Sequence, residues 1–582
     1  MNSGVIRRNK NLYFTFVAHF QPYTMATTLP AAFQHPYPID SRFSKSVAYF
    51  SMEFAIDQAL KTYSGGLGFL AGSHMKSAYD LKQNLIGIGI LWKQGYYDQV
   101  RMPDNSMGVL FREKMYSFLQ DTGAHFTINV FGRPVWVRAY YLDPTHFNTV
   151  PMFFLTTDVD GNDEQARSIS YRLYDSDPTL KAAQCMVLGL GGAKFLDEIN
   201  YSPAIYHFNE AHALSGAFHL YQQLGKSKDA LRERLIFTTH TPEEAGNEKH
   251  NIHFLNNLGF FGGLSLDEVR ELTGIQEDVF NHSLAALRMA RRANGVSKLH
   301  GEVARKMWGN YPDICPITHI TNAQNYRYWA DTQLAEAYQN KDAEALLARK
   351  RAMKQPLLNI VSDQAGKLFD PNVLTIVWAR RFAAYKRPDL LLADEERFMR
   401  LLNNPEYPVQ IVWAGKPYPF DEGAKQTFNR LYYHSHLYPN MAVLTGHELA
   451  LSKVLKDGAD VWLNTPVVPR EASGTSGMTA AMNGAINLST NDGWICEFAK
   501  PGLNSFIVPE ADPQATADMR DAHDRNGIFD LLEQHILPTY YNRPGRGTAN
   551  EWQGLVAQSM TDVLAYFTAD RMAREYYERV YA

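Results

Sequence analysis

The segment LTIVWARRFAAYKRPDL, residues 374–390, predicts the fold of this chain. Its apolar start, 374–379, is suited to a buried strand, and a polar stretch with four basic side chains follows. Similar short apolar runs, separated by helix-length stretches of mixed polarity, recur at residues 409–415, 441–446, 459–466 and 485–490. Short strands that alternate with helices are typical of βαβ units with a parallel sheet. We therefore predict a doubly wound α/β domain in this half.

The first half of the chain has the same pattern with long insertions. The apolar runs VAYF, IGIGILW, AIYHF and LIFTTH alternate with helix-like segments such as NEAHALSGAFHLYQQL. Two doubly wound domains would hold their ligands in the crevice beyond the carboxyl ends of the strands, so we expect the chemistry between the halves. We predict a partly disordered N-terminal extension at residues 1–46 and an α/β domain with insertions at 47–325. A second α/β domain, which starts with connecting helices, follows at 326–545, and a C-terminal helix at 546–582 packs back on both domains.

Composition excludes several classes of protein. The 582 residues are enough for two or more domains, and a net charge of -4 gives no basic excess for nucleic acid. Three widely spaced cysteines provide neither a disulfide framework nor zinc-ligand spacing, so we expect no metal and a reducing cytoplasm. No apolar run is long enough for a membrane span. The weakly signal-like N-terminus is interrupted by His19 and Gln21 and lacks a convincing cleavage site.

Two segments that follow predicted strands are candidates for binding phosphate. In TYSGGLGFLAGSH, the glycines at 65, 66 and 68 would let backbone N–H groups approach an anion, although a tight turn also favours glycine. The basic side chains after the strand at 374–379 could clamp phosphate oxygens, although many such clusters are solvated helix faces: Arg380, Arg381, Lys386 and Arg387.

Polar residues after other strands complete the candidate site. In EASGTSGM, Glu471 could accept hydrogen bonds from sugar hydroxyls, and the glycine-rich turn after it could present amides to an anion; a capped helix start explains only part of that run. His240 follows another strand, as does a group with Asn209, Glu210 and His212. A single histidine there is more often a core residue, but two polar strand ends in one half favour a shared pocket.

Together these motifs resemble the short bacterial type of α-glucan (glycogen) phosphorylase. The resemblance extends from about residue 47 to 492 and includes YFSMEFAIDQALKTYSGGLGFLAG, HFNEAHA, FTTHTP, RRANGVSKLHGEVARKMW, WARRFAAYKRPDLL, WAGK and EASGTSGM, in that order. It implies a GT-B fold, in which two Rossmann-like domains face a central cleft. The implied reaction is α-1,4-glucan plus phosphate to glucose 1-phosphate, with retained anomeric configuration and with pyridoxal phosphate as cofactor. A homodimer is one arrangement that it implies.

The resemblance assigns roles to residues by motif. The residues that act in catalysis would be His240, which contacts the sugar, and the substrate-phosphate ligands Arg381 and Lys386. Sugar hydroxyls would be bound by Asn322, Glu471, Ser473 and Gly474. The phosphate groups of substrate and cofactor would be held by Gly65, Gly66, Arg380, Thr475, Ser476 and Gly477. These roles suit a bond broken through an oxocarbenium-like state, because bound phosphate can supply both the proton and the negative charge.

Residue 479 departs from the family pattern. The family has a lysine here that forms a Schiff base with pyridoxal phosphate, whereas this chain has Thr479, which cannot form one. Smaller departures are Ala323, Gln324 and Cys185. Three functions stay open: a phosphorylase with non-covalent pyridoxal phosphate, a cofactor-free glycosyltransferase that uses a nucleotide-sugar donor, and a non-catalytic glucan-binding relative. Of these we favour the phosphorylase, with an α-glucan and phosphate or a phosphorylated sugar as partners.

Overall fold

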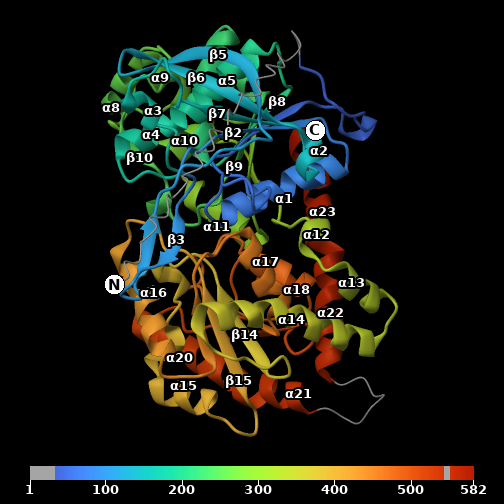
Figure 1. The fold of residues 1–582 in the computed structure, drawn as a ribbon. Helices are drawn as coiled ribbons and strands as arrows, with labels where there is room; N and C mark the ends of the chain where they lie inside the picture. The colour runs from blue at the N-terminus through green and yellow to red at the C-terminus, as the bar shows by residue number, and fades with distance from the viewer. Residues whose placement is uncertain (1–32, 543–550) are drawn as a thin grey trace, which may run out of the picture.

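The computed structural model describes residues 33–542 and 551–582. The first part of the predicted extension, 1–32, and the predicted boundary at 545–546 lie outside these residues. The predicted mixed α/β class is confirmed: two large sheets, each covered by helices, are stacked along the long direction of the molecule (Figure 1). None of the helices within the described ranges has both the length and the apolar character needed to cross a bilayer.

The N-terminal sheet contains nine strands. From one edge to the other they are β13 (Ile317–His319), β12 (Arg292–Gly295), β9 (Leu235–Thr238), β8 (Ile205–Asn209), β1 (Val47–Phe50), β2 (Leu85–Ile90), β7 (Met152–Thr156), β6 (Arg133–Leu142) and β5 (Gln120–Val130). Strands β13 to β7 are parallel, and β6 and β5 continue the sheet in antiparallel fashion. The strand order reverses direction between β1 and β8, and such a point opens a crevice for ligands.

The C-terminal sheet contains six strands, all parallel. In spatial order they are β16 (Met441–Leu444), β15 (Val409–Ala414), β14 (Leu374–Ala379), β17 (Val461–Asn464), β18 (Ile486–Ser489) and β19 (Ser505–Ile507). Every residue of β14 is buried because helices cover both faces of the sheet, which explains why its sequence is continuously apolar rather than alternating. The order reverses again, here between β14 and β17.

Helices connect the strands in both halves. Around the N-terminal sheet they are α1 (Gly66–Asp80), α2 (Pro144–Phe147), α3 (Glu164–Ser168), α4 (Pro178–Met186), α5 (Gly192–Glu198), α6 (Ser215–Gln223), α7 (Lys228–Arg232), α8 (Ile252–Leu258), α9 (Leu266–Thr273), α10 (His282–Met289) and α11 (Lys298–Trp308). Those that follow are α12 (Tyr326–Trp329), α13 (Thr332–Gln339), α14 (Ala343–Ala365), α15 (Glu395–Leu402), α16 (Glu422–Ser435), α17 (Leu449–Gly458), α18 (Ser476–Met482), α19 (Ile495–Phe498), α20 (Ala517–Leu531), α21 (Leu537–Tyr541), α22 (Glu551–Tyr566) and α23 (Ala569–Glu575).

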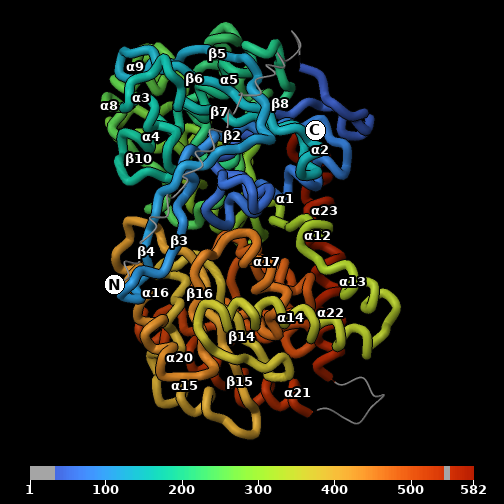
Figure 2. The backbone as a smooth tube through the Cα atoms, viewed as in Figure 1, coloured from blue at the N-terminus to red at the C-terminus, as the bar shows by residue number. Residues whose placement is uncertain are grey.

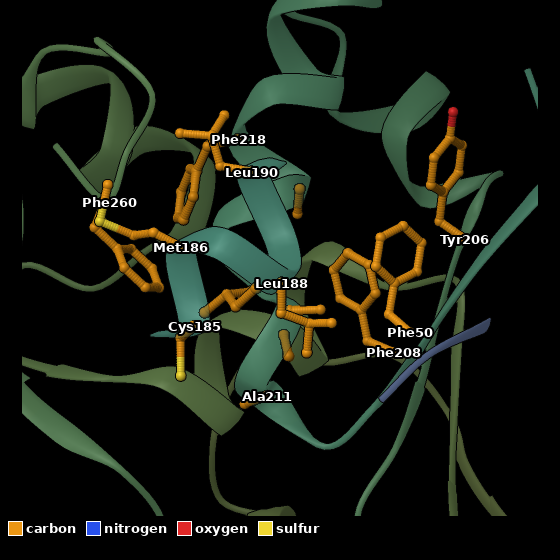
Figure 3. Packing of buried hydrophobic residues seen from close by; sticks show 14 of the residues in the cluster. Phe50, Cys185, Met186, Leu188, Leu190, Tyr206, Phe208, Ala211, Phe218 and Phe260 are labelled. Atoms are coloured by element: carbon orange, nitrogen blue, oxygen red, sulfur yellow. The ribbon is translucent and has the colours of Figure 1, made fainter. Parts of the chain in front are cut away.

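A large core fixes the N-terminal sheet against its helices. Phe50 of β1 and Phe208 of β8 pack edge to face, with ring centroids 5.3 Å apart, under the helical segment that contains Met186 and Leu188 (Figure 3). All four side chains are fully buried. At about 25 cal/mol per Å² of apolar surface removed from water, such contacts dominate the stability of the scaffold that positions the strand ends.

Two segments cross from one half of the chain to the other and add to the contacts between them. The hairpin of β3 (Asp98–Arg101) and β4 (Met107–Leu110) leaves the N-terminal half and lies against the C-terminal half (Figure 2). There Gln99 donates to the carbonyl of Gly415 at 2.9 Å and accepts from the amide of Gly446 at 3.0 Å. The C-terminal helices pass from the C-terminal half back to the N-terminal half: α22 packs on α18, and α23 packs on α1. The two sheets are therefore held in one arrangement by packing on both sides.

Candidate functional site

The predicted site residues follow the carboxyl ends of strands in both sheets. Asn209 ends β8 and His240 follows β9 in the N-terminal sheet. Arg380 and Arg381 follow β14, and Glu471 lies in the loop between β17 and α18. Parallel strands all end at the same edge of their sheet, so each sheet gathers these side chains at one edge.

A carboxylate and two cations form the centre of the C-terminal side. Lys386 forms an ion pair with Oε2 of Glu471, and Nη1 of Arg380 lies 3.5 Å from the same oxygen. The three side chains are at most 13 % exposed. Burial alone would raise the pKa of Glu471, but the charges of Lys386 and Arg380 outweigh it and hold the pKa below its ordinary value. Glu471 is therefore a carboxylate at neutral pH, so two positive charges face one negative charge.

Arg380 connects this centre to the glycine-rich turn. Its Nη2 donates to Oδ1 of Asn464 and lies 3.4 Å from the hydroxyl of Ser476. Its buried Nε has no hydrogen-bond partner among the described residues, nor does the hydroxyl of Ser473. Unpaired buried polar groups are costly, so these atoms are suited to a ligand with hydrogen-bonding oxygens.

Glycine is required at two positions of the turn for steric reasons. Gly474 has a φ of +85°, and a Cβ there would lie 3.2 Å from Cγ of Glu471. At Gly477, a Cβ would lie 2.4 Å from Oδ1 of Asn487. Glycine at 477 therefore permits close packing of α18 on β18, and glycine at 474 keeps the turn tight beside the carboxylate. Thr475, between them, is buried.

The glycine-rich loop before α1 faces a different carboxylate. Oε2 of Glu53 accepts hydrogen bonds from the backbone amides of Ser64 at 2.6 Å and Gly65 at 3.0 Å. An added Cβ at Gly66 would meet nothing within 4 Å, whereas at Gly68 it would lie 2.8 Å from Oε2 of Glu53. Gly68 is thus needed for packing, whereas Gly65 and Gly66 both have free space around them. Sequence reasoning missed Glu53, because nothing local indicates that a residue before the loop would bond to it.

His240 lies in a polar cavity of the N-terminal half. Its Nε2 is 2.7 Å from Oδ1 of Asn209, and its backbone amide donates to Oε1 of Glu210. The adjoining cavity of about 180 Å³ is lined among others by Glu210, His212, His240, His250 and His282. The predicted shared pocket of the two strand ends is therefore present.

Burial controls the charges in this cavity. It lowers the pKa of His240 to about 3 and that of His212 to about 4, so both rings are neutral at pH 7. It raises the pKa of Glu210 to about 7, although hydrogen bonds from His240 and Thr241 oppose the shift. Glu210 also has a φ of +68°, which costs energy for a residue other than glycine and is often found at functional positions.

Asp492 is a further residue of the site that sequence reasoning missed. Its Oδ2 accepts from the backbone amide of Glu471 at 2.8 Å, and its buried Oδ1 has no partner among the described residues. Burial, with the nearby charge of Glu471, raises its pKa to about 8. The carboxyl is therefore mostly protonated at neutral pH and supports the loop without adding negative charge. The sequence signal that could have identified Asp492 is its position just after the apolar run at 485–490, which is a predicted strand.

Other predicted residues are placed as follows. Arg381 is exposed beside the buried cluster. Asn322 is buried in the loop after β13, and its Oδ1 has no partner within the described part of the chain. Its neighbour Thr321 donates to Glu497 of the C-terminal half at 2.8 Å, and Ser297 donates to the carbonyl of Ala472 at 2.7 Å. These bonds join the loop after β12 to the loop that carries Glu471, and the loop after β13 to α19.

Arg387 has a different role from its neighbours in the basic segment. It forms ion pairs with Asp521 and Asp524, each at 2.6 Å, and donates to the carbonyls of Thr465 and Pro466. Its guanidinium therefore stabilises the fold and is not available to a phosphate.

Thr479 lies on α18, and its side chain is satisfied within that helix. The residue is 1 % exposed, and its hydroxyl donates to the carbonyl of Ser476 at 3.0 Å. The unpartnered Nε of Arg380 fits an oxygen of a phosphorylated ligand such as pyridoxal phosphate, and the unpartnered hydroxyl of Ser473 fits a sugar hydroxyl. Thr479, by contrast, provides no amine for covalent attachment. The site thus fits the phosphate end of that cofactor, and position 479 does not fit its covalent anchor.

Comparison with known proteins gives a consistent result. Residues 319–507 match the carbohydrate phosphorylase family. An uncharacterised protein of Methanocaldococcus jannaschii is 44% identical over 92% of this chain and 100% of its own length. The maltodextrin phosphorylase of Thermococcus litoralis is 32% identical over 98% of this chain and 74% of its own. The glycogen phosphorylase of Mycobacterium tuberculosis is 32% identical over 92% of this chain and 70% of its own.

Proposed function

The chain belongs to the carbohydrate phosphorylase family, and on this premise we propose that it transfers glucosyl units between an α-1,4-glucan and phosphate. The products of the forward reaction are a glucan shortened by one unit and glucose 1-phosphate with retained anomeric configuration. The relatives named as maltodextrin and glycogen phosphorylases support this reaction class.

We further propose a GT-B arrangement, with two Rossmann-like domains, 47–325 and 326–545, that face a central cleft. The parallel strands of the two sheets and the reversal of strand order in each support it. The bonds from Ser297 to Ala472 and from Thr321 to Glu497 are contacts expected where such domains meet. The glucan would enter on the N-terminal side, and the phosphate would be held on the C-terminal side.

The observation that carries the proposal is the group of Glu471, Lys386 and Arg380 beside the exposed Arg381. One carboxylate is surrounded by cations whose total charge exceeds its own, so the group can accept a phosphate dianion while Glu471 binds a sugar hydroxyl. In the reaction, a proton of the bound phosphate goes to the glycosidic oxygen, the bond from that oxygen to the anomeric carbon breaks, and a phosphate oxygen bonds to the same carbon.

His240 would contribute as a neutral ring. With a pKa of about 3 it carries no charge at working pH, so it can hydrogen-bond a sugar hydroxyl without opposing the positive charge that develops on the sugar. Asn209 fixes the orientation of the ring through its contact with Nε2. Asn322, with its unpartnered oxygen, would bind another hydroxyl of the same sugar.

Pyridoxal phosphate, if bound, supplies a second phosphate that assists proton transfer to and from the substrate phosphate. Arg380, Thr475, Ser476 and Gly477 would hold that group. Thr479 permits a second candidate, a cofactor-free glycosyltransferase whose nucleotide-sugar donor places its own second phosphate there, because the residue offers no amine for covalent attachment of the cofactor. The Gly-rich turn and the cations would serve both functions.

One comparison separates these candidates. The purified protein is incubated with maltoheptaose and phosphate, with and without pyridoxal phosphate, and in parallel with nucleotide-glucose donors and an acceptor glucan. Release of glucose 1-phosphate that increases with added cofactor supports the proposal. Release of nucleotide, with no glucose 1-phosphate, supports the second candidate instead.

A further inference from the structure

Lys456 of α17 is a buried lysine whose ammonium has no polar partner. The residue is 1 % exposed, and Nζ lies 3.7 Å from the centre of the Trp329 ring and 5.2 Å from that of Phe69. Within the described parts of the chain, Nζ has neither a hydrogen-bond acceptor nor a carboxylate at ion-pair distance. The two aromatic faces compensate a buried charge by about 2 kcal/mol or somewhat more, which is well below the cost of burying an unpaired ammonium.

The other buried lysines of this half are satisfied. Lys350 donates to the carbonyls of Asp457 and Asn483 at 2.8 and 2.7 Å. Lys354 forms an ion pair with Asp460 at 2.6 Å, and Lys416 does so with Glu448 at 3.0 Å. Lys456 is the exception among them, and a buried ammonium without such partners is costly enough to lose its proton instead.

The chemical state of Lys456 follows from this environment. Burial lowers its pKa well below the ordinary value, and the nearby charge of Lys453 lowers it further, although Asp457 opposes the shift. A lysine without its proton is a nucleophile that reacts with carbonyl groups, and desolvation in an apolar pocket is a recognised way to obtain one. The structure thus provides the reactive amine that position 479 lacks.

The aromatic ring under this amine is also linked to the helix that carries the altered position. Trp329, on which Nζ stacks, is tied to α18 because Asn483 donates to its carbonyl at 2.8 Å and to the carbonyl of Thr479 at 3.0 Å. Trp329 and Met478, which precedes Thr479, belong to one buried cluster, and Phe69 of α1 packs against it. The amine of Lys456 therefore lies over two rings, one that packs beside α18 and one on the helix that begins at Gly66.

We propose that Lys456, and not residue 479, is the lysine that covalently holds an aromatic aldehyde carrying a phosphate monoester, the chemical class of pyridoxal phosphate. The nitrogen of Lys456 attacks the aldehyde carbon and forms a carbon–nitrogen double bond. The aldehyde oxygen leaves as one water molecule with the two protons of the amine. Arg380 and Ser476 would bind the phosphate end. This inference rests on the phosphate site of the proposed function. Its test, however, measures covalent attachment of the aldehyde to Lys456 and not the rate of glucosyl transfer.

Attachment is tested directly on the full-length protein. The protein is incubated with pyridoxal phosphate at neutral pH, reduced with borohydride, digested and analysed by peptide mass spectrometry. We expect the reduced adduct on the peptide that contains Lys456, with yields that change little between about pH 7 and pH 9, since an ordinary lysine titrates near 10.4. An adduct on other lysines with Lys456 unmodified would overturn the proposal.

Variants provide matched controls. Lys456→Met should lose the adduct, whereas Lys453→Met, on the same helix, should keep it because Lys453 is half-exposed and already paired with Asp457. If the methionine variant does not fold, Lys456→Arg keeps a long basic side chain over Trp329 and also cannot form the bond. In the double variant Lys456→Met with Thr479→Lys, the adduct should appear at residue 479. Labelling of Lys456→Arg equal to that of the native protein contradicts the assignment.

The outcomes remain separable from those of the proposed function. Phosphorolysis with no adduct at Lys456 rejects this inference and leaves the proposed function intact. An adduct at Lys456 without any glucosyl transfer supports the inference and rejects the proposed function.

Discussion

The ammonium of Lys386 forms an ion pair with Oε2 of Glu471, although the two residues are far apart in sequence and nearly buried. Arg380 approaches the same oxygen at 3.5 Å. The loop after β17 is thus held to the strand end of β14 by charge. This pair is also the point at which a phosphate and a sugar would be bound together.

Glu471→Gln should destabilise the protein and increase its response to phosphate. Removing the carboxylate leaves two buried cations unpaired, which costs about 3 kcal/mol in the free energy of unfolding. Phosphate would replace the missing charge, so it should raise the melting temperature of the variant more than that of the native protein. Thermal unfolding is measured with phosphate and with chloride at equal ionic strength. Equal stabilisation of both proteins by phosphate would argue against an anion site here.

Alanine variants of Arg381 and Arg387, which lie in one segment, should have different effects: the first on activity and the second on stability. Arg381→Ala removes an exposed side chain, so the free energy of unfolding should stay within about 0.5 kcal/mol while phosphate-dependent transfer is lost. Arg387→Ala leaves Asp524 buried without its partner and should cost about 3 kcal/mol. Urea denaturation and initial rates measure the two effects. Undiminished turnover of Arg381→Ala would remove this arginine from the phosphate site.

Gly66 and Gly68 offer a second matched pair. An added methyl group at Gly66 meets no atom within 4 Å, so Gly66→Ala should fold normally but hinder the approach of phosphate. At Gly68 the methyl group would lie 2.8 Å from both Oε2 of Glu53 and Cβ of Tyr63, so Gly68→Ala should lower the melting temperature. We expect a higher KM for phosphate in the first variant. An unchanged KM would place the phosphate away from this loop.

Asp492→Asn should reduce the pH dependence of stability. The pKa of Asp492 is raised from 3.8 to about 8, so the folded protein binds this proton more tightly than the unfolded chain does. Its contribution to stability is complete below about pH 4 and is lost as the pH rises to about 8. Between pH 5 and pH 8 the free energy of unfolding should therefore fall more for the native protein than for the variant. The exposed Asp512→Asn serves as the control, and parallel curves for native and Asp492→Asn proteins would contradict the shift.

The sequence predicts the parallel strands well because their buried runs are continuous. VAYF, LTIVWA and VQIVWA correspond to β1, β14 and β15, where both faces of the sheet are covered. The antiparallel strands β5 and β6 were not predicted. They pair with each other and with β7 through contacts that no local pattern specifies, and a bulge between Asp121 and His125 interrupts the alternation in β5.

In the candidate site, the motifs predicted those residues whose role follows from the type of side chain and its place after a strand. The arginines after β14 and the glycine-rich turn are of this kind. Glu53, Asp492 and Lys456 could not be predicted, because their roles depend on burial and on partners distant in the sequence. Arg387 shows the converse: the segment predicts a cation, but only the structure shows that Asp521 and Asp524 engage it.

The most direct test of the account is phosphorus NMR of the purified protein with maltoheptaose, phosphate and pyridoxal phosphate. The account predicts that the inorganic phosphate signal decreases while α-glucose 1-phosphate appears, and that Arg381→Ala shows neither change. A phosphate signal that stays constant in the native protein, with nucleotide-glucose consumed in a parallel sample, would contradict it.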